Sequence, residues 1–276
     1  MMRLVRDTRS VLIGGISAFS TRLTDAQLAS YAELMARRSS EAEQETFQIA
    51  PALTLSDFSD RSTEPLYKYV SDDTWQRYIS KGSIQLGTAS YYRTTPNMNI
   101  RDRREGASTF HLLADDFTFN VDMMIGDNCA VFCGTAQMEG PDHELMRSRF
   151  GERRIKIDPL PDFIAFISER TKAFRTRVFD VRYTDLKHFV AEDLEITRYF
   201  QTVGKGDLDA AALRKLNENY FDIFHDYAFL PSLFSKPLAY ADERERRIVF
   251  ELTDDISAPI NINDEALLKF ITPVGT

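Results

Sequence analysis

The chain has 276 residues, of which 43% are hydrophobic and 28% are charged. This composition is typical of globular proteins and argues against a chain that is mostly disordered. The net charge of −8 argues against a protein that holds nucleic acid through a broad cationic surface, although it leaves room for a local basic groove. No apolar run is long enough to span a bilayer, and no disulfide framework of cysteines is present. We therefore expect a cytoplasmic protein that does not bind membranes.

Residues 1–61 are predicted to form a helical appendage. The apolar run at 11–19 resembles a signal peptide only faintly, because an acidic residue lies in its charged flank and no cleavage site follows. From residue 24 to about residue 45 the apolar side chains recur at helical spacing, at Leu28, Tyr31, Leu34 and Met35. Residues 57–65 are polar and end in a proline, so we place the start of the main domain at residue 62.

Residues 62–276 are predicted to form one α+β domain with a mixed, mainly antiparallel sheet and flanking helices. Alternating or continuous apolar runs predict strands at 66–70, 84–92, 117–122, 129–134, 178–183 and 244–252. Capping residues and apolar stripes predict helices at 71–82, 142–150, 161–174 and 209–228. The order of these elements has no regular βαβ alternation, which favours the antiparallel or mixed arrangement over a parallel sheet.

The two cysteines, Cys129 and Cys133, lie four residues apart in an apolar run that is typical of a buried strand. Side chains four apart on a strand share one face, so we expect both cysteines to be buried and reduced. The four histidines of the chain show no paired spacing. A four-ligand zinc site would need such partners, so no metal is expected.

A polar loop at 93–106 follows the predicted strand 84–92. Tyr91 and Tyr92 end this strand, and Arg93 begins the loop. An aromatic face next to a fixed cation can stack on a base and pair with a phosphate. The same residues also fit an ordinary strand end with a solvated loop, and both interpretations stay open.

Residues 240–252 alternate carboxylates and guanidiniums at the entrance to an apolar strand. In an extended strand Glu245 and Arg247 share one face, whereas Arg246 shares the other face with Ile248 and Phe250. A rigid strand can present such a carboxylate to a ligand. The alternative is an edge strand whose charges prevent aggregation and form exposed ion pairs.

Five short motifs follow one another between residues 66 and 252. They are Leu66-Tyr-Lys-Tyr-Val, Ile79-Ser-Lys-Gly-Ser-Ile-Gln-Leu-Gly, Tyr-Arg with Arg-Asp-x-x-Glu-Gly, Cys-Ala-Val-Phe-Cys, and Lys236-Pro-x-x-Tyr-x-x-Glu-x-Glu-x-Arg-Ile. This order resembles bacterial domain-of-unknown-function proteins found among toxins and phage-defence systems. Those proteins in turn resemble remote members of the ADP-ribosyltransferase superfamily, which includes DarT.

The resemblance implies that residues 62–276 form a split-sheet domain that binds NAD in a cleft and transfers ADP-ribose to a nucleic-acid or protein acceptor. In the superfamily the first strand carries a His or Arg, for which this chain has Tyr67 or Tyr69, and a late strand carries the acid. The residues implied for NAD binding are Tyr67, Tyr69, Tyr91, Tyr92, Arg93 and Arg247, and those implied for catalysis are Glu245 and Glu243. The Glu-x-Glu spacing predicts that both acids lie on one strand face, where they can share one ribose. An acid beside Arg247 would stay ionised at neutral pH, as stabilisation of an oxocarbenium-like transition state requires.

A non-enzymatic module that binds a nucleotide or a protein partner explains the same pattern, with the N-terminal helix docked on another protein. The two hypotheses differ in geometry. An active site requires Glu243 or Glu245 to converge with Tyr67 or Tyr69.

Overall fold

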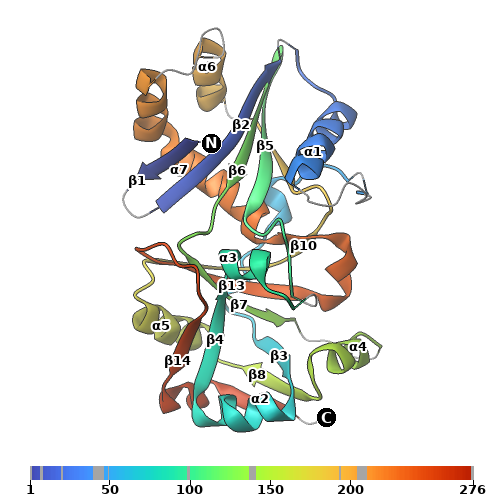
Figure 1. Cartoon of the computed structure of the whole chain (residues 1–276), viewed down its shortest axis with the longest axis vertical. Coiled ribbons are helices and arrows are strands. Elements are labelled where there is room, and N and C mark those ends of the chain that lie inside the picture. The colour runs from blue at the N-terminus through green and yellow to red at the C-terminus, as the bar shows by residue number, and fades with distance from the viewer. Residues whose placement is uncertain are drawn as a thin grey trace. The chain divides into compact units, whose positions relative to one another are not determined.

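The computed structural model describes residues 2–6, 9–19, 21–39, 47–48, 50–97, 100–136, 141–192, 194–203 and 210–274 (Figure 1). The chain forms two compact units. Unit 1 consists of residues 1–58, 103–126 and 184–237, and unit 2 consists of residues 59–102, 127–183 and 238–276. This division differs from the predicted boundary between residues 61 and 62. The reason is that the N-terminal strands, which we did not predict, share a sheet with residues 107–124.

Unit 1 contains a five-stranded sheet in the order β1-β2-β6-β5-β11. All its strand pairs are antiparallel except β11 with β5. Its strands are β1 (Met2–Arg6), β2 (Arg9–Phe19), β5 (Ala107–Ala114), β6 (Phe117–Met124) and β11 (His188–Ala191), with a short β12 (Ser235–Lys236). Its helices are α1 (Asp25–Ser39), α6 (Leu194–Val203) and α7 (Ala210–Leu233), with a short 3-10 turn η1 (Leu55–Asp57).

Helices α1 and α7 cover opposite faces of the unit 1 sheet (Figure 1). Phe110 of β5 lies against Phe224 and Tyr227 of α7, whereas the next residue, His111, lies against Tyr31 of α1. Neighbouring side chains on a strand point to opposite faces, which fixes this arrangement. The predicted helix at 24–45 is confirmed from residue 25 to residue 39, and residues 40–46 lie outside the described part of the chain.

Unit 2 contains an eight-stranded antiparallel sheet. Its strands are β3 (Leu66–Val70), β4 (Ser83–Thr88), β7 (Cys129–Thr135), β8 (Arg153–Ile157), β9 (Arg175–Asp180), β13 (Glu245–Glu251), β14 (Ile260–Asn263) and β15 (Ile271–Val274), with a short β10 (Arg182–Tyr183). Its helices are α2 (Asp72–Arg77), α3 (Ala89–Thr94), α4 (Pro141–Phe150) and α5 (Leu160–Thr171), with 3-10 turns η2 (Ile79–Lys81), η3 (Leu238–Glu243) and η4 (Glu265–Lys269).

One face of the unit 2 sheet forms an apolar core with α5. Ile248 and Phe250 of β13 lie in this core with Phe132 of β7, whose ring is 5.5 Å from that of Phe163 in α5. The predicted division of the faces of β13 is therefore confirmed, since Ile248 and Phe250 point inward together. The predicted fold class, α+β with mainly antiparallel sheets and flanking helices, is confirmed for the described chain.

Strand β7 is the branch point of the unit 2 sheet. Along one edge, β13 pairs with it from Cys129 to Thr135. Along the other edge two strands share it: β4 pairs at Ala130 and Val131, and β3 pairs at Thr135. Between these two pairings the edge of β7 faces a gap, so the sheet divides into a β4–β14 limb and a β3–β8–β15 limb.

The predicted strand at 84–92 is too long, because β4 ends at Thr88 and Tyr91 and Tyr92 lie in α3. The Thr88 hydroxyl accepts a hydrogen bond from the Tyr91 backbone N–H at 3.0 Å and thereby caps the helix. In the described ranges, none of the helices is both long and apolar enough to cross a membrane.

Candidate functional site

Five polar side chains lie around β7 where the unit 2 sheet divides, and we call them the branch cluster: Lys68 of β3, Tyr92 of α3, Cys133 of β7, and Glu245 and Arg247 of β13. Cys133 and Arg247 are direct partners in the β7–β13 register, so their side chains share a face. The Tyr92 hydroxyl oxygen is 3.6 Å from the Cys133 sulfur. The Lys68 Nζ donates to the Cys133 carbonyl oxygen at 2.7 Å.

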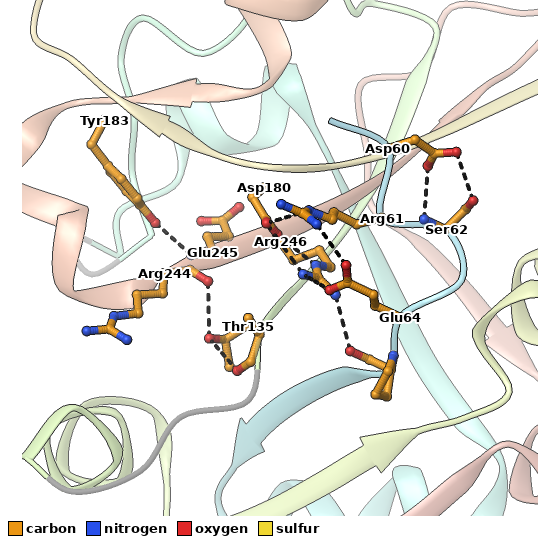
Figure 2. Close-up of polar contacts among 12 residues, drawn as sticks. Asp60, Arg61, Ser62, Glu64, Thr135, Asp180, Tyr183, Arg244, Glu245 and Arg246 are labelled. Atoms are coloured by element: carbon orange, nitrogen blue, oxygen red, sulfur yellow. Dashed lines mark hydrogen bonds and ion pairs between the residues drawn. The ribbon is translucent and has the colours of Figure 1, made fainter. Parts of the chain in front are cut away.

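Glu245 is the first residue of β13, and its carboxylate is buried against a guanidinium. Its Oε1 accepts a hydrogen bond from Arg247 Nε, and the two side chains are 6% and 3% exposed. The Glu245 backbone N–H donates to the Tyr183 hydroxyl at 2.7 Å (Figure 2). A charge-assisted pair of this kind, closed to water, keeps the carboxylate in one orientation.

Two hydrogen-bond donors of the branch cluster, Tyr92 and Lys68, have shifted pKa values. Burial raises the pKa of Tyr92 well above its ordinary value, and Cys133 and Glu245 raise it further, so the phenol stays protonated at neutral pH. Burial lowers the pKa of Lys68, while Cys133 and Glu245 act in the opposite direction. Together they provide a neutral donor and a partly desolvated ammonium within the same cluster.

Sequence reasoning missed Lys68, although a signal was present. Leu66, Lys68 and Val70 alternate onto the same face of β3, and the two apolar residues lie in the core. Lysine is rarely buried on such a face without a specific partner. The Lys68 ammonium lies 5.0 Å from the centroid of the Phe132 ring, next to the gap.

Tyr67 lies in the same row as Glu245. Tyr67 pairs with Thr135, and Thr135 pairs with Glu245, so the three side chains share one face across β3, β7 and β13. Two strand spacings separate the Cα atoms of Tyr67 and Glu245 by roughly 10 Å. An arginine, Arg154, stands over the Tyr67 ring with its guanidinium carbon 5.2 Å from the centroid.

Tyr69 lies in a different environment from Tyr67. Its hydroxyl is 2.6 Å from His143 Nδ1, and its ring packs against Met146 and Phe150. These three partners all belong to α4. The structure therefore brings Tyr67 into the row of Glu245, and it places Tyr69 beneath α4.

Glu243 does not share a strand face with Glu245, contrary to the prediction from their Glu-x-Glu spacing. Glu243 ends the 3-10 turn η3, and Arg244 follows with a left-handed backbone (φ 42°) before β13 begins. This reversal separates the two carboxylates into different ion pairs. Glu243 Oε1 lies 3.3 Å from Arg149 NH1, whose guanidinium also covers the Tyr240 ring.

Tyr91 and Arg93 extend from the turn of α3 that carries Tyr92. The rings of Tyr91 and Tyr92 are 5.6 Å apart, and Arg93 forms a partly buried ion pair with Asp127 at 3.1 Å. Arg93 therefore anchors α3 to the segment before β7. Its contact lies at the other end of β7 from Thr135 and Glu245.

Arg246 points to the face of β13 opposite to that of Glu245 and Arg247. Its Nε donates to Asp180 Oδ1 and its NH2 donates to Glu64 Oε2, each at 2.7 Å (Figure 2). Arg61 bonds the same two carboxylates at 3.0 and 2.8 Å. The four charges tie the segment before β3 to β9 and β13, which is a structural role.

The two cysteines lie on one face of β7, as predicted, and neither is in a disulfide, but their burial differs. Cys129 is buried, and burial together with Glu251 raises its pKa well above the ordinary value. Cys133 is partly exposed, which corrects the prediction that both are buried. No group of three or more His, Cys, Asp or Glu side chains that could hold a metal ion occurs among the described residues.

The branch cluster combines an oriented carboxylate, a neutral phenol and an ammonium at a break in a rigid sheet. Such a set can stabilise developing positive charge and bind an anionic group beside it. No protein-family model, curated protein or solved structure matches this chain. Its function is therefore inferred from its own residues.

Proposed function

We propose that unit 2 is an ADP-ribosyltransferase-like domain that uses NAD as a substrate, with the branch cluster as its site. The observation that carries this proposal is the buried Glu245–Arg247 pair of β13, whose Glu245 lies in one row with Tyr67. The sequence resemblance to the superfamily and the forked sheet agree with it. A cytoplasmic toxin or anti-phage effector that modifies nucleic acid or protein is the biological setting that we propose.

The proposed reaction breaks the glycosidic bond between the ribose C1′ and the nicotinamide nitrogen of NAD. Nicotinamide leaves as a neutral molecule with the bonding electron pair, and an acceptor oxygen or nitrogen forms a new bond to C1′ and gives up its proton. Positive charge develops on the ribose between these events. The ionised carboxylate of Glu245 stabilises that charge, because a fixed anion in a dry site acts more strongly than one in water.

The other members of the branch cluster have distinct roles in this proposal. Arg247 holds the Glu245 carboxylate in place, and the protonated Tyr92 hydroxyl donates to a ribose or amide oxygen. Lys68 supplies, on the first strand of unit 2, a cation for the phosphates in place of the His or Arg that the superfamily carries there. Tyr67 offers a ring for the nicotinamide to stack on.

A nicotinamide-release assay combined with an NAD-binding titration tests the proposal. We expect Glu245→Gln to keep NAD binding and to lower turnover by about 100-fold or more, as loss of one preorganised electrostatic group does. Glu251→Gln is the matched control, because Glu251 is a buried acid on the same face of the same strand, between Arg175 and Arg177 at 3.6 and 3.7 Å. It should lower stability without a selective loss of turnover. Wild-type protein that neither binds nor cleaves NAD would refute the proposal.

A non-enzymatic binding module is the second candidate, and the burial of both acids favours it. Glu243 and Glu245 are 4% and 5% exposed, each held in an ion pair. A carboxylate that is closed to solvent can serve the structure of a nucleotide- or partner-binding surface without touching a substrate. NAD binding without release of nicotinamide, unchanged in Glu245→Gln, would support this candidate over the enzyme.

A further inference from the structure

A chain of buried hydrogen-bonding groups runs through the sheet of unit 1 beneath α1. His111 Nδ1 is 2.7 Å from Asn120 Oδ1, and His111 Nε2 is 3.2 Å from His188 Nδ1. His188 Nε2 is 3.0 Å from the Ala50 carbonyl oxygen. All three side chains are at most 1% exposed, so water does not supply their partners.

The Ala50 carbonyl fixes the proton positions in this chain. A carbonyl only accepts, so His188 Nε2 must carry a hydrogen. If both imidazoles are neutral, His188 Nδ1 accepts from His111 Nε2, and His111 Nδ1 is left as an acceptor. Asn120 must then turn its Nδ2 toward His111, because two acceptors cannot bond each other.

With Asn120 Oδ1 toward His111, as in the structure, His111 Nδ1 must donate instead. The histidine pair then carries one additional proton, shared between His111 Nε2 and His188 Nδ1. The Asn120 Nδ2 in this orientation is buried without a partner among the described residues. A half-turn of the amide together with uptake of one proton from solvent therefore converts the neutral chain into the charged one, and all three contacts are retained.

Helix α1 covers this chain and docks on the unit 1 sheet through one fully buried large side chain, Leu28, and several small ones. Ala29, Ala32 and Ala36 pack on Leu186, and the Tyr31 hydroxyl is 3.0 Å from Ser17 Oγ. Alanine side chains bury little apolar area, so Leu28 supplies most of the apolar burial and the part of the helix after it is held mainly by small contacts. The Tyr31 ring stands edge-on to His111, with centroids 6.1 Å apart.

We propose that Asn120, His111 and His188 form a one-proton switch, in which proton uptake with a turn of the Asn120 amide loosens the docking of α1 on the unit 1 sheet. The charged or titratable groups around the pair come from three elements. Asp25 of α1 and Arg104 before β5 act on His188, and Tyr31 of α1 lies against His111. Arg38 of α1 and Asp122 of β6 act on Tyr31 in turn. Lys187 and Asp185 are held by other bonds, to the Arg104 carbonyl and to the Gln48 backbone N–H.

The folded state resists the additional proton. Burial lowers the pKa of His111 to about 3; the Asn120 hydrogen bond opposes this shift, and the charge of His188 adds to it. Burial also lowers the pKa of His188, with the Ala50 carbonyl acting against it and Arg104 adding to it. Proton uptake therefore favours any movement that admits water to the pair. Helix α1, whose Tyr31 ring lies against His111, is the element whose movement would admit that water.

Nuclear magnetic resonance of the imidazole nitrogens tests the proton assignment. At pH 7.5 we expect both rings to be neutral with the hydrogen on Nε2, and on acidification we expect one shared proton below pH 6. Asn120→Asp places an acceptor-only group at His111, so it should raise the proton affinity of the pair at least about tenfold, one pKa unit. Independent titration of the two rings near pH 6.5, or an unchanged affinity in Asn120→Asp, would overturn the assignment.

Hydrogen exchange of the full-length protein, corrected for the intrinsic effect of pH, tests the movement. The protection of the α1 backbone amides from exchange should fall over the pH range in which the histidine pair takes up its proton. The protection of the α7 amides should stay constant over the same range. The double variant His111→Gln/His188→Gln should remove this response, and Asn120→Asp should move it to higher pH. The control is His143→Gln, which changes a histidine of unit 2 and should leave the pH response of the α1 amides unchanged. Protection of α1 that does not follow the titration of the pair would overturn the proposal.

Discussion

At the scale of single residues, the two arginines on neighbouring positions of β13 show how a strand assigns roles. Arg246 and Arg247 are both about 2% exposed, yet they point to opposite faces. Arg246 bonds two half-exposed carboxylates, whereas Arg247 bonds the buried Glu245. The period of two along the strand predicted this division from the sequence, because it depends only on local backbone geometry.

Arg246→Ala is expected to lower the free energy of unfolding by about 1–3 kcal/mol, since it leaves Glu64 and Asp180 without their buried donor but still near water. NAD binding and turnover should not fall beyond what this loss of stability explains. Denaturant unfolding beside the NAD assays measures both effects. A selective loss of turnover in a stably folded variant would show that Arg246 belongs to the site.

Lys68 is the residue whose change separates binding from folding most directly. Lys68→Met keeps the length of the side chain over Phe132 and removes the ammonium, so the fold should remain. If Lys68 meets the phosphates of NAD, its loss should weaken NAD binding at least about tenfold, or 1.4 kcal/mol. Isothermal titration of wild type and variant checks this, with Lys156→Met, a partly exposed lysine of β8 paired with Asp158, as the control.

At the scale of elements, α3 depends on a glycine of the strand before it. A Cβ atom at Gly87 would lie 2.3 Å from the Tyr92 hydroxyl oxygen, so any other residue there would displace the ring. The sequence predicted a strand through Tyr92, because the apolar and aromatic pattern continues without a break. The capping bond of Thr88 and the close approach of Tyr92 to Gly87 are tertiary features that such a pattern does not contain.

Gly87→Ala is therefore expected to push the Tyr92 ring away from Cys133 with little loss of stability, since the far end of a tyrosine side chain can move. The Cys133 thiol should then react faster with a thiol reagent. Cys129 should stay unreactive until the protein unfolds, because it is buried. The Cys133→Ser variant retains only the Cys129 thiol, so its reaction rate identifies which of the two rates in wild type belongs to each cysteine. Equal rates in wild type and Gly87→Ala would mean that Tyr92 does not cover Cys133.

At the scale of the whole molecule, the chain builds two units from alternating segments. Helices and the strands near β13 were predictable, because capping and periodicity are local. The membership of residues 1–58 in a sheet with 107–124 was not, because strand pairing between distant segments leaves no local pattern. Likewise the Glu243–Arg149 pair and the Lys68 contact with Cys133 join segments far apart in sequence.

The location of two buried histidines in unit 1 predicts how the stability of the two units changes at low pH. His111 and His188 both lie in unit 1, and burial lowers the pKa of each. A histidine whose pKa is lower in the folded than in the unfolded state stabilises the fold fully above the unfolded value of about 6.5. That stability is lost as the pH falls from about 6.5 toward the folded pKa, which is about 3 for His111.

Acid should therefore weaken unit 1 before unit 2. The single tryptophan, Trp75, lies in α2 of unit 2, so its fluorescence follows that unit. Circular dichroism follows the helices of both units. Between pH 6.5 and 4.5 we expect the midpoint of urea unfolding by circular dichroism to fall below the midpoint by fluorescence, whereas at pH 7.5 the gap should be smaller. The His111→Gln/His188→Gln variant should keep the gap constant, because neither glutamine titrates. If the two midpoints coincide at every pH, protonation of the buried pair does not lower the stability of unit 1 selectively, and the prediction is wrong.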